Sequence, residues 1–232
     1  MTLKILVVDD EARIRKQLTI GLTGFGYTVS AAENGMEALV KIAQEQPDVV
    51  ILDISLGSEP DGVEVCRRLR EWSNTSVIML SVHDEEKTKV QALTVGADDY
   101  LTKPFGMAEL NARIIAVRRR VVPESGAEQK AEIRVGDLYI NLAQRVVEVE
   151  GEAVHLTPKE YDLLRLLATH PGKVMTHHAI LKAVWGSEYG AMDHYVRVFV
   201  NLIRKKLREN PARNVRYIIN EPGVGYRFID SD

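Results

Sequence analysis

The chain has 232 residues, enough for one large domain or two of ordinary size, and its 45% hydrophobic and 27% charged content is typical of a globular protein and excludes a disordered one. One cysteine, Cys66, excludes an internal disulfide and fits a reducing compartment. No apolar stretch approaches the ~18–20 residues that a membrane span requires, so we expect a cytoplasmic protein with no membrane partner.

Residues 1–120 alternate between short apolar runs and segments with helical spacing. Apolar runs predict strands at residues 3–8, 27–32, 48–53, 76–80 and 99–101. Helical spacing predicts helices at residues 12–21, 85–95 and 107–120, and two more that begin after Asn34 and after Asp61. This alternation predicts an α/β fold, a doubly wound five-stranded parallel sheet with helices on both faces.

Polar side chains follow four of these strands, at the point where each strand ends. They are Asp9, Asp10, Asp53, Ser81 and Lys103, and the bond from Lys103 to Pro104 is a candidate for the cis form. The carboxyl ends of parallel strands share one edge of a sheet, and ligands bind there. Three carboxylates at that edge would repel one another unless a cation lies among them, and oxygen ligands of this kind suit Mg²⁺. Together with the ammonium and the hydroxyl group, they form a site for a phosphoryl group on a carboxylate.

Simpler interpretations of the same residues remain open when each motif is taken alone. Asp9 and Asp10 could simply cap the helix that follows them, because acidic side chains are favoured at helix N-termini. The sequence Lys103-Pro104-Phe105 could be an ordinary turn. The conjunction of five such residues at the ends of four strands is what favours a phosphoryl site.

Four motifs carry a resemblance to a known family: Val-Val-Asp-Asp-Glu at 7–11, Ile-Leu-Asp-Ile at 51–54, Leu-Ser at 80–81 and Gly-Ala-Asp-Asp-Tyr-Leu-Thr-Lys-Pro-Phe at 96–105. They resemble the receiver domain of two-component response regulators over residues 1 to about 120. The resemblance implies that Asp53 is the phosphoacceptor, which takes a phosphoryl group from a histidine of a sensor kinase. It also implies that the protein catalyses nothing beyond its own phosphorylation and dephosphorylation.

The same resemblance implies roles for the neighbours of Asp53. Asp10 would be a direct Mg²⁺ ligand, Asp9 a water-mediated one, and the backbone carbonyl of Ser55 a further protein ligand beside Asp53 itself. Ser81 and Lys103 would bind phosphoryl oxygens. Tyr100 matches the switch aromatic of the family, which turns inward when Ser81 moves toward the phosphate.

The loop after the phosphoacceptor departs from the family pattern. Family members usually have Leu-Pro followed closely by Asp-Gly, whereas residues 54–60 lack the early proline and are about one residue longer. No functional side chain is lost by this change, but it bears on the rigidity of the loop and on the lifetime of the phosphoryl group.

Charged residues in the last third of the receiver segment match positions that pair across a dimer in the OmpR/PhoB branch of the family. Opposite charges on one face suit a two-fold contact, so the resemblance implies a homodimer on activation. The other interpretation is a set of ordinary surface ion pairs, each worth ~0–1 kcal/mol. The positions are Lys89, Asp98, Asp99, Glu109, Arg113 and Arg120.

Residues 121–131 lose periodicity and gain polar and helix-breaking residues, which predicts a linker between a receiver domain at 1–120 and a second domain at 132–232. From Ile133 the apolar pattern has period two, which predicts short antiparallel strands. Thr157, Pro158 and Glu160 have the spacing of a helix start with a capping box. Two further helices at 176–185 and 192–208, followed by a hairpin at 217–229, predict an α+β winged helix-turn-helix domain.

The helix at 192–208 is the predicted DNA-recognition helix. Residues 194–216 hold seven basic side chains and one acid, a local charge of +6 that suits phosphate binding. Its inward face is expected to carry the apolar residues Val196, Val200, Ile203 and Leu207. Arginine and asparagine read base edges and lysine neutralises phosphates, so the helix is expected to lie in the major groove of double-stranded DNA. The candidate DNA-binding residues, partly or wholly outward, are His194, Tyr195, Arg197, Asn201, Arg204 and Lys205 on this helix and Arg227 in the hairpin.

This second half resembles the OmpR/PhoB-type effector domain over its whole length. The motifs are Leu-Thr-Pro-Lys-Glu-Tyr-Asp-Leu-Leu at 156–164, Val-Trp-Gly at 184–186 and Gly-Tyr-Arg-Phe at 225–228. Residues 70–73, 193–199 and 210–213 are similar to the branch members that regulate potassium-pump operons, which implies control by potassium limitation. Many members have an arginine where this chain has Pro222, which puts one minor-groove contact in doubt.

The leading hypothesis is therefore a response regulator that a sensor histidine kinase phosphorylates on Asp53, that then dimerises, and that binds promoter DNA, with RNA polymerase as a further candidate partner. One alternative is a phosphorylation-independent DNA-binding regulator with a vestigial receiver, against which the intact acidic cluster argues. Another is an aspartyl-phosphate phosphatase of the haloacid-dehalogenase type. Such enzymes need a second acid two residues after the nucleophile, and that position is Ser55.

Overall fold

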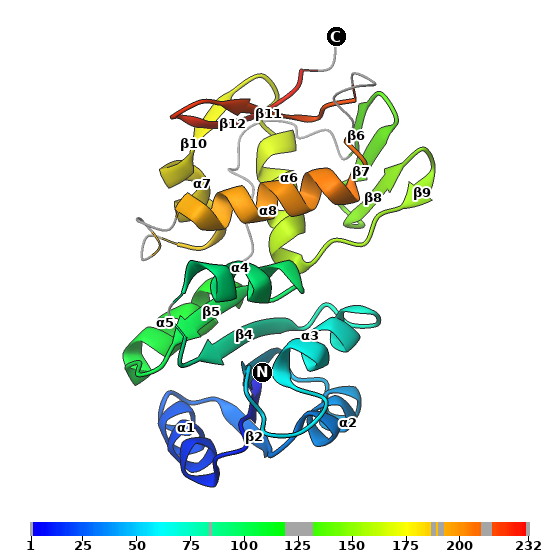
Figure 1. The fold of residues 1–232 in the computed structure, drawn as a ribbon. Coiled ribbons are helices and arrows are strands. Elements are labelled where there is room, and N and C mark those ends of the chain that lie inside the picture. The colour runs from blue at the N-terminus through cyan, green and yellow to red at the C-terminus, as the bar shows by residue number, and fades with distance from the viewer. Residues whose placement is uncertain are drawn as a thin grey trace. The chain divides into compact units, whose positions relative to one another are not determined.

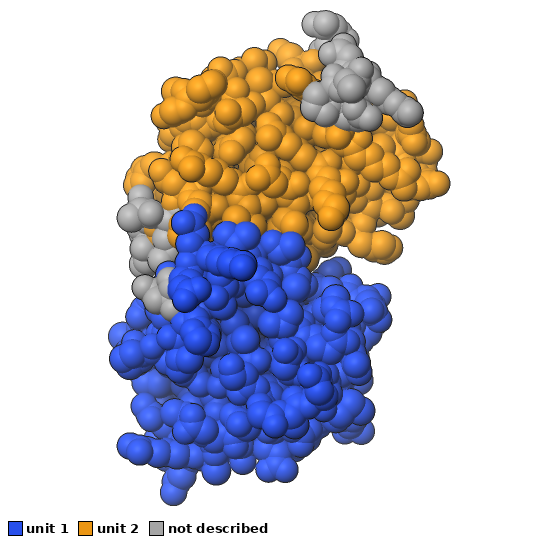
Figure 2. All heavy atoms as spheres, in the orientation of Figure 1, with its two compact units in different colours: residues 1–118 blue, residues 119–232 orange. Residues whose placement is uncertain are grey.

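The computed structural model describes the chain except for residues 1, 84, 119–131, 187–188, 190–192, 210–214 and 231–232. It consists of two compact units, Met1–Arg118 and Arg119–Asp232 (Figures 1 and 2). The predicted linker at 121–131 and Arg120 lie outside the described residues. Each unit is described by itself.

The first unit is built on a five-stranded parallel sheet with the strand order β2-β1-β3-β4-β5. The fold is the doubly wound α/β sheet that the alternation of elements predicted. Its strands are β1 (Lys4–Val8), β2 (Thr28–Ala32), β3 (Val49–Asp53), β4 (Ser76–Ser81) and β5 (Asp99–Thr102). Its helices are α1 (Ala12–Gly24), α2 (Gly35–Glu45), α3 (Gly62–Arg70), α4 (Glu86–Thr94) and α5 (Met107–Arg118).

Strand β3 lies in the middle of this sheet and is buried along its whole length. Val50 and Leu52 belong to a core formed with α2, α3 and α4, whereas Val49 and Ile51 belong to a second core formed with α1 and α5. A strand covered on both faces has an unbroken apolar run, which is why the sequence indicated it so clearly. Asp53 is the residue at which this strand leaves both cores.

The helix boundaries follow local hydrogen-bonding signals. Asn34 accepts a hydrogen bond from the Glu37 amide (2.9 Å), and Asp61 accepts one from the Glu64 amide (2.8 Å), so both side chains cap the helices that were expected to begin after them. Helix α1 runs on to Gly24, past the expected end at residue 21, because Leu22 still packs into the core.

The second unit is a winged helix-turn-helix domain, as predicted. An antiparallel sheet in the order β6-β7-β8-β9 comes first, and three helices follow among the described residues and pack against one another. A hairpin closes the unit together with a further strand, β10, that the sequence had not indicated. Its strands are β6 (Glu132–Val135), β7 (Leu138–Asn141), β8 (Val146–Val149), β9 (Glu152–Ala153), β10 (Val174–Thr176), β11 (Ile218–Glu221) and β12 (Gly225–Phe228). Its helices are α6 (Pro158–Ala168), α7 (His177–Val184) and α8 (Asp193–Lys206).

The start of α6 has the predicted capping box. The Thr157 hydroxyl accepts a hydrogen bond from the Glu160 amide (3.4 Å), and the Glu160 carboxylate accepts one from the Thr157 amide (2.7 Å). Lys206 at the end of α8 donates a further hydrogen bond to the same carboxylate (2.6 Å), which joins α8 to the start of α6.

Candidate functional site

Three carboxylates meet at the carboxyl edge of the parallel sheet. Strand β1 ends just before Asp9 and Asp10, and β3 ends in Asp53. One oxygen atom from each of the three side chains lies within 4.8 Å of the others. Asp9 and Asp53 are buried and Asp10 is exposed, so the cluster opens to solvent on one side.

Lys103, just after β5, neutralises part of this cluster. Its Nζ donates hydrogen bonds to Asp53 Oδ2 (2.6 Å) and Asp9 Oδ2 (2.8 Å). The peptide bond to Pro104 is cis, as the sequence suggested. Burial raises the pKa of Asp53, and the nearby ammonium opposes that rise. Burial by itself would lower the pKa of Lys103, but the hydrogen bonds to both carboxylates outweigh it and raise the pKa.

The donor set fits a magnesium ion. It offers three hard carboxylate oxygens, and a single ammonium leaves the cluster negative. Asp53 Oδ1 accepts a hydrogen bond from the Ser55 amide (3.3 Å), and Asp9 Oδ1 accepts one from the Glu11 amide (2.9 Å). The role of the Ser55 carbonyl as a metal ligand stays a prediction.

The sequence analysis did not identify Arg15, a residue of α1 that holds the backbone of Asp9 and Asp10. Its Nη1 donates to the backbone carbonyls of Asp9 and Asp10, at 2.8 Å each. It also lies 3.6 Å from the Glu33 carboxylate. Arg15 therefore fixes the backbone of Asp9 and Asp10 through their carbonyl groups, and these hydrogen bonds do not involve the two carboxylates.

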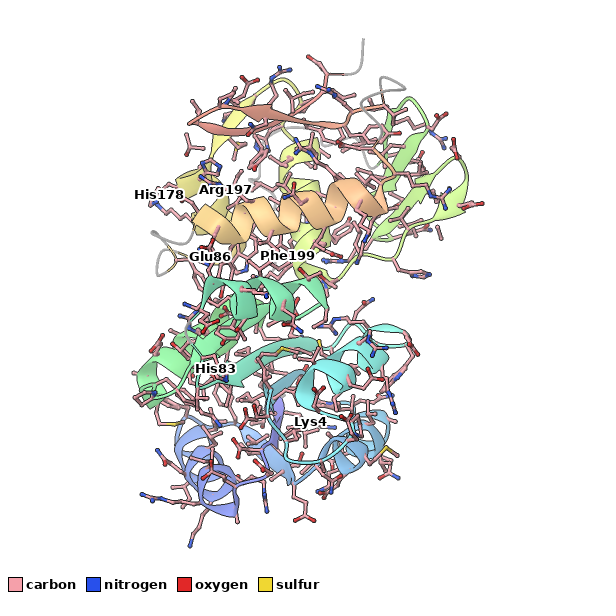
Figure 3. The ribbon with its side chains drawn as sticks, viewed as in Figure 1. Lys4, His83, Glu86, His178, Arg197 and Phe199 are labelled. Carbon is pink, nitrogen blue, oxygen red and sulfur yellow. The ribbon has the colours of Figure 1, made fainter. Side chains whose placement is uncertain are left out.

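The two predicted switch residues both contact the backbone of His83. Ser81 Oγ, at the end of β4, accepts a hydrogen bond from the His83 amide (3.0 Å). The Tyr100 hydroxyl donates to the His83 carbonyl, and its ring packs in the core of the first unit. Tyr100 therefore lies inward. Figure 3 labels His83, which follows β4.

The unusual loop at 54–60 is anchored at two points. Leu56 is buried in the core and Pro60 is buried after a cis bond from Glu59. Between these points Gly57 has a φ of +61°, and a Cβ atom on it would lie 2.8 Å from Asp10 Oδ2. The loop thus passes directly beside the exposed carboxylate of the acidic cluster.

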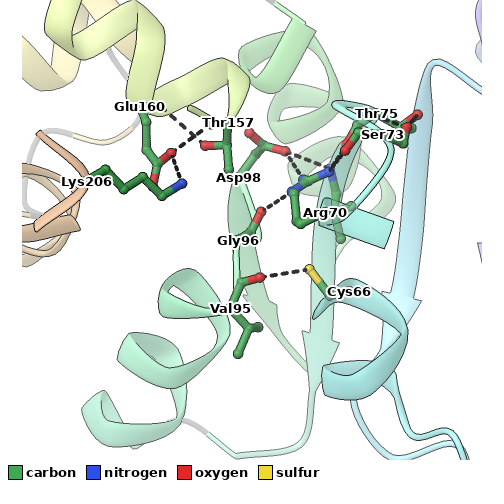
Figure 4. A network of polar contacts seen from close by, with 11 residues as sticks. Cys66, Arg70, Ser73, Thr75, Val95, Gly96, Asp98, Thr157, Glu160 and Lys206 are labelled. Carbon is green, nitrogen blue, oxygen red and sulfur yellow. Dashed lines mark hydrogen bonds and ion pairs between the residues drawn. The ribbon is translucent and has the colours of Figure 1, made fainter. Parts of the chain in front are cut away.

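The predicted dimer-face acids make ion pairs within the chain. Arg113 lies 3.2 Å from Asp99 and 3.0 Å from Glu109, and Asp98 Oδ2 accepts hydrogen bonds from Arg70 Nη2 and the Val77 amide, at 2.9 Å each. Figure 4 shows Arg70 joined to Asp98, to Gly96 and to the loop before β4. Lys89 is half-buried on α4, and the dimeric role of this face stays a prediction.

Helix α8, the predicted recognition helix, has the apolar inward face that the sequence indicated, with Val196, Val200, Ile203 and Leu207 all buried. Arg197, Asn201 and Lys205 are exposed, and His194 is half-buried. Figure 3 labels Arg197 and Phe199, which lie on different sides of the helix. Arg227 on β12 reaches the surface beside Glu221, 3.0 Å from its carboxylate.

The expectation that Tyr195 lies outward was wrong. Its ring is buried and packs edge-on against Trp185 (centroids 6.1 Å apart) and Tyr189 (6.0 Å). An aromatic ring at this position adds buried apolar area to the core, and that gain outweighs solvent exposure of its hydroxyl.

Comparison with known proteins agrees with this geometry. Residues 5–115 match the response regulator receiver domain, and residues 151–228 match the C-terminal domain of transcriptional regulatory proteins. The KDP operon transcriptional regulatory protein KdpE of Escherichia coli (strain K12) is 42% identical over 225 residues, which cover 97% of this chain and 98% of the relative. The chain belongs to the OmpR/PhoB-type two-component response regulators.

Two further relatives span nearly the whole length of this response regulator. The transcriptional regulatory protein KdpE of Mycobacterium tuberculosis (strain ATCC 25618 / H37Rv) is 43% identical and covers 98% of the chain and 99% of its own length. The crystal structure of the response regulator DrrB, a Thermotoga maritima OmpR/PhoB homologue, is 33% identical, with a TM-score of 0.52 over 99% of this chain and 100% of DrrB. Among the described helices of the response regulator, none is long and apolar enough to cross a membrane.

Proposed function

We propose that Asp53 accepts a phosphoryl group from the histidine of a sensor kinase. A carboxylate oxygen of Asp53 attacks phosphorus, the bond from phosphorus to the imidazole nitrogen breaks, and the imidazole leaves with the bonding electrons. The observation that supports this proposal is the ammonium of Lys103, 2.6 Å from Asp53 and 2.8 Å from Asp9. An ammonium this close to Asp53 supports a role in pairing with a phosphoryl oxygen.

Mg²⁺, when held by Asp9, Asp10, Asp53 and the Ser55 carbonyl, supplies positive charge that neutralises the phosphoryl oxygens. The chain's own residues do the rest. Ser81, one strand away at the end of β4, offers its hydroxyl to another oxygen. Beyond its own phosphorylation and dephosphorylation, we propose no catalysis.

The output of phosphorylation is dimerisation and binding to promoter DNA. The Tyr100 hydroxyl and Ser81 both contact the backbone of His83. A shift of Ser81 toward a phosphoryl group would therefore move His83 and change the position of Tyr100, which belongs to the face built from α4, β5 and α5. That face carries the charged residues that pair across the proposed two-fold dimer. Two recognition helices would then lie on tandem half-sites, with RNA polymerase as a candidate neighbour.

The regulated genes are proposed to include a potassium-transport operon of the kdp type. Support comes from the two KdpE relatives, which match nearly the full chain. Selection of bound fragments from the genome of the source organism by the activated protein tests this. Enrichment upstream of a potassium-transport operon is expected, and enrichment only elsewhere would refute this part of the proposal.

The central experiment compares wild-type protein with Asp53→Ala. Incubation with acetyl phosphate and Mg²⁺ should add one phosphoryl group to the wild type and none to the variant, as measured by intact-protein mass. Glu59→Ala, which removes an exposed acid from the same segment, should take up phosphoryl normally. Undiminished uptake by Asp53→Ala would assign the acceptor elsewhere.

Treatment with beryllofluoride and Mg²⁺ tests the output. Sedimentation should show a dimer, and the affinity for duplex DNA should rise. DNA binding that is unaffected by activation would favour the vestigial-receiver alternative, and steady hydrolysis of phosphate monoesters would favour the phosphatase.

A further inference from the structure

The hairpin of β11 and β12 is the wing of the second unit, and a basic cleft lies between α8 and its first strand, β11. Its volume is ≈ 400 Å³, and its lining includes Arg204, Lys205, Arg216, Ile218 and Asn220. The lining also includes Glu209, the single acid of the basic segment 194–216. An acid in a surface that must bind DNA phosphates needs a structural explanation.

The carboxylate of Glu209 contacts groups of its own domain. Its Oε1 accepts hydrogen bonds from the backbone amides of Tyr217 (3.0 Å) and Ile218 (2.9 Å), and only 6% of its side chain is exposed. Its Oε2 lies 3.5 Å from Arg204 Nε. Glu209 therefore joins the chain just beyond α8 to the entrance of β11.

Arg204 makes the second half of the same connection. Its Nη2 donates to the Ile218 carbonyl (2.8 Å), and its guanidinium lies over the Tyr226 ring on β12, 5.7 Å from the centroid. Both backbone groups of Ile218 are thus held from the α8 side, its N–H by Glu209 and its carbonyl by Arg204. The other edge of β11 pairs with β12.

We propose that Arg204 and Glu209 are positioning residues that fasten the wing to the recognition helix, so that both elements meet DNA in one fixed relation. This inference rests on the proposed DNA binding, and it changes the role predicted for Arg204. The guanidinium acts through Ile218 and does not read a base. Exposed Arg197, Asn201 and Lys205 remain to contact DNA.

The two roles of Arg204 predict different salt dependence. The salt slope is the magnitude of the fall of log K with log salt concentration, and each phosphate that a side chain neutralises adds about 0.9 to it. A positioning residue adds nothing to that slope, because its loss disturbs geometry and removes no ion contact. Two residues that hold the same strand should also have strongly non-additive effects.

The test is a double-mutant cycle in the full-length protein. The probes are a 30-base-pair duplex recovered with the wild type from a random pool, and an unselected duplex of the same length. Arg204→Ala and Glu209→Ala should each weaken binding to the recovered duplex by about tenfold, which corresponds to the loss of one or two buried hydrogen bonds. The double variant should be no weaker than either single one, and the salt slope should stay at the wild-type value.

Three further variants serve as controls. Glu209→Gln keeps an oxygen acceptor for both amides and should recover most of the affinity. Lys205→Ala should lower the salt slope by about one unit and add to Glu209→Ala. Glu150→Ala, which removes an exposed acid elsewhere in the domain, should leave the ratio of selected to unselected affinity unchanged.

Additive losses, or a lower salt slope with relaxed base preference for Arg204→Ala alone, would show that Arg204 contacts DNA directly. If the wild type does not prefer its selected duplex, the DNA-binding proposal itself fails. Amide hydrogen exchange then still decides whether the wing is fastened in this way, since Ile218 should exchange faster in Glu209→Ala than in Glu209→Gln. Equal exchange at Ile218 would overturn the inference, and unchanged phosphoryl uptake confirms that each variant keeps a folded first unit.

Discussion

Lys103 Nζ and Asp53 Oδ2 lie 2.6 Å apart at the carboxyl edge of the parallel sheet, and the same nitrogen lies 2.8 Å from Asp9. Lys103 is thus the counter-charge of two buried carboxylates even without a phosphoryl group. The ammonium of Lys103 and a cation bound at the cluster would both offset the repulsion between the three carboxylates.

Lys103→Met should therefore destabilise the protein and increase its dependence on Mg²⁺. Removal of one partner from a buried charge cluster costs about 3 kcal/mol. Thermal unfolding should show a lower Tm without Mg²⁺, and a larger rise of Tm on addition of Mg²⁺ than in the wild type. Lys87→Met, which removes an exposed lysine from α4, should behave as the wild type does. An equal response to Mg²⁺ in both variants would contradict this account.

Gly57→Ala should weaken Mg²⁺ binding. The substitution places a methyl group 2.8 Å from Asp10 Oδ2 and forces a side chain into a backbone with φ +61°, which alone costs about 1 kcal/mol. Calorimetric titration should show a lower affinity for Mg²⁺. Gly106→Ala is the matched control, because a Cβ atom there meets nothing within 4 Å. Unchanged affinity in Gly57→Ala would mean that Asp10 can move away freely.

Arg70→Ala should be far more destabilising than Arg68→Ala on the same helix. Arg70 donates to the carbonyls of Gly96 (2.8 Å) and Thr75 (2.7 Å) and pairs with the buried Asp98. Its loss should cost about 3 kcal/mol in the free energy of unfolding. Arg68 is half exposed and pairs with Glu64, so its loss should cost less than about 1 kcal/mol. Chemical denaturation measures both, and similar costs would refute the network as a stabilising element.

Cys66 should be unreactive in the folded protein. It is buried against α4, and burial raises the pKa of its thiol to about 11, from an ordinary value of 9.0. Because the folded pKa is the higher one, the thiol favours the folded state below pH 9 and this contribution is lost as pH rises from about 9 toward 11. A disulfide reagent at pH 8 should modify Cys66 only at the rate of unfolding. Rapid modification in native buffer would disprove its burial.

The sequence was sufficient to predict the fold of the first unit, because the apolar runs and the polar residues that end them are local patterns. The run at 49–53 is apolar up to its final aspartate, and each functional side chain lies at or just after the end of a strand. Parallel pairing then brings those strand ends to one edge, so the order of strands and loops along the chain was enough to place Asp9, Asp53 and Lys103 together.

The one contradicted placement, that of Tyr195, and two contacts that the sequence did not show all join residues that lie apart in the chain. Tyr195 falls at the border of the inward face of α8, where helical spacing alone does not decide, and Trp185 and Tyr189 draw it into the core. The bond from Arg204 to Ile218 joins residues 14 apart in the chain, and the pair of Arg70 and Asp98 joins residues 28 apart. Such pairings form only in the folded chain, so the pattern of charges along the sequence does not predict them.

The loop at 54–60 is held by two buried residues, with an exposed arc between them. Leu56 and Pro60 are both buried, so an extra residue between them lengthens only the exposed arc that contains Gly57. Asp53 ends β3 before the arc, and Asp61 caps α3 after it. The arc is therefore a place where natural variation, or a grafted peptide tag, could change access of water to the acidic cluster while the sheet and helix around it stay as they are.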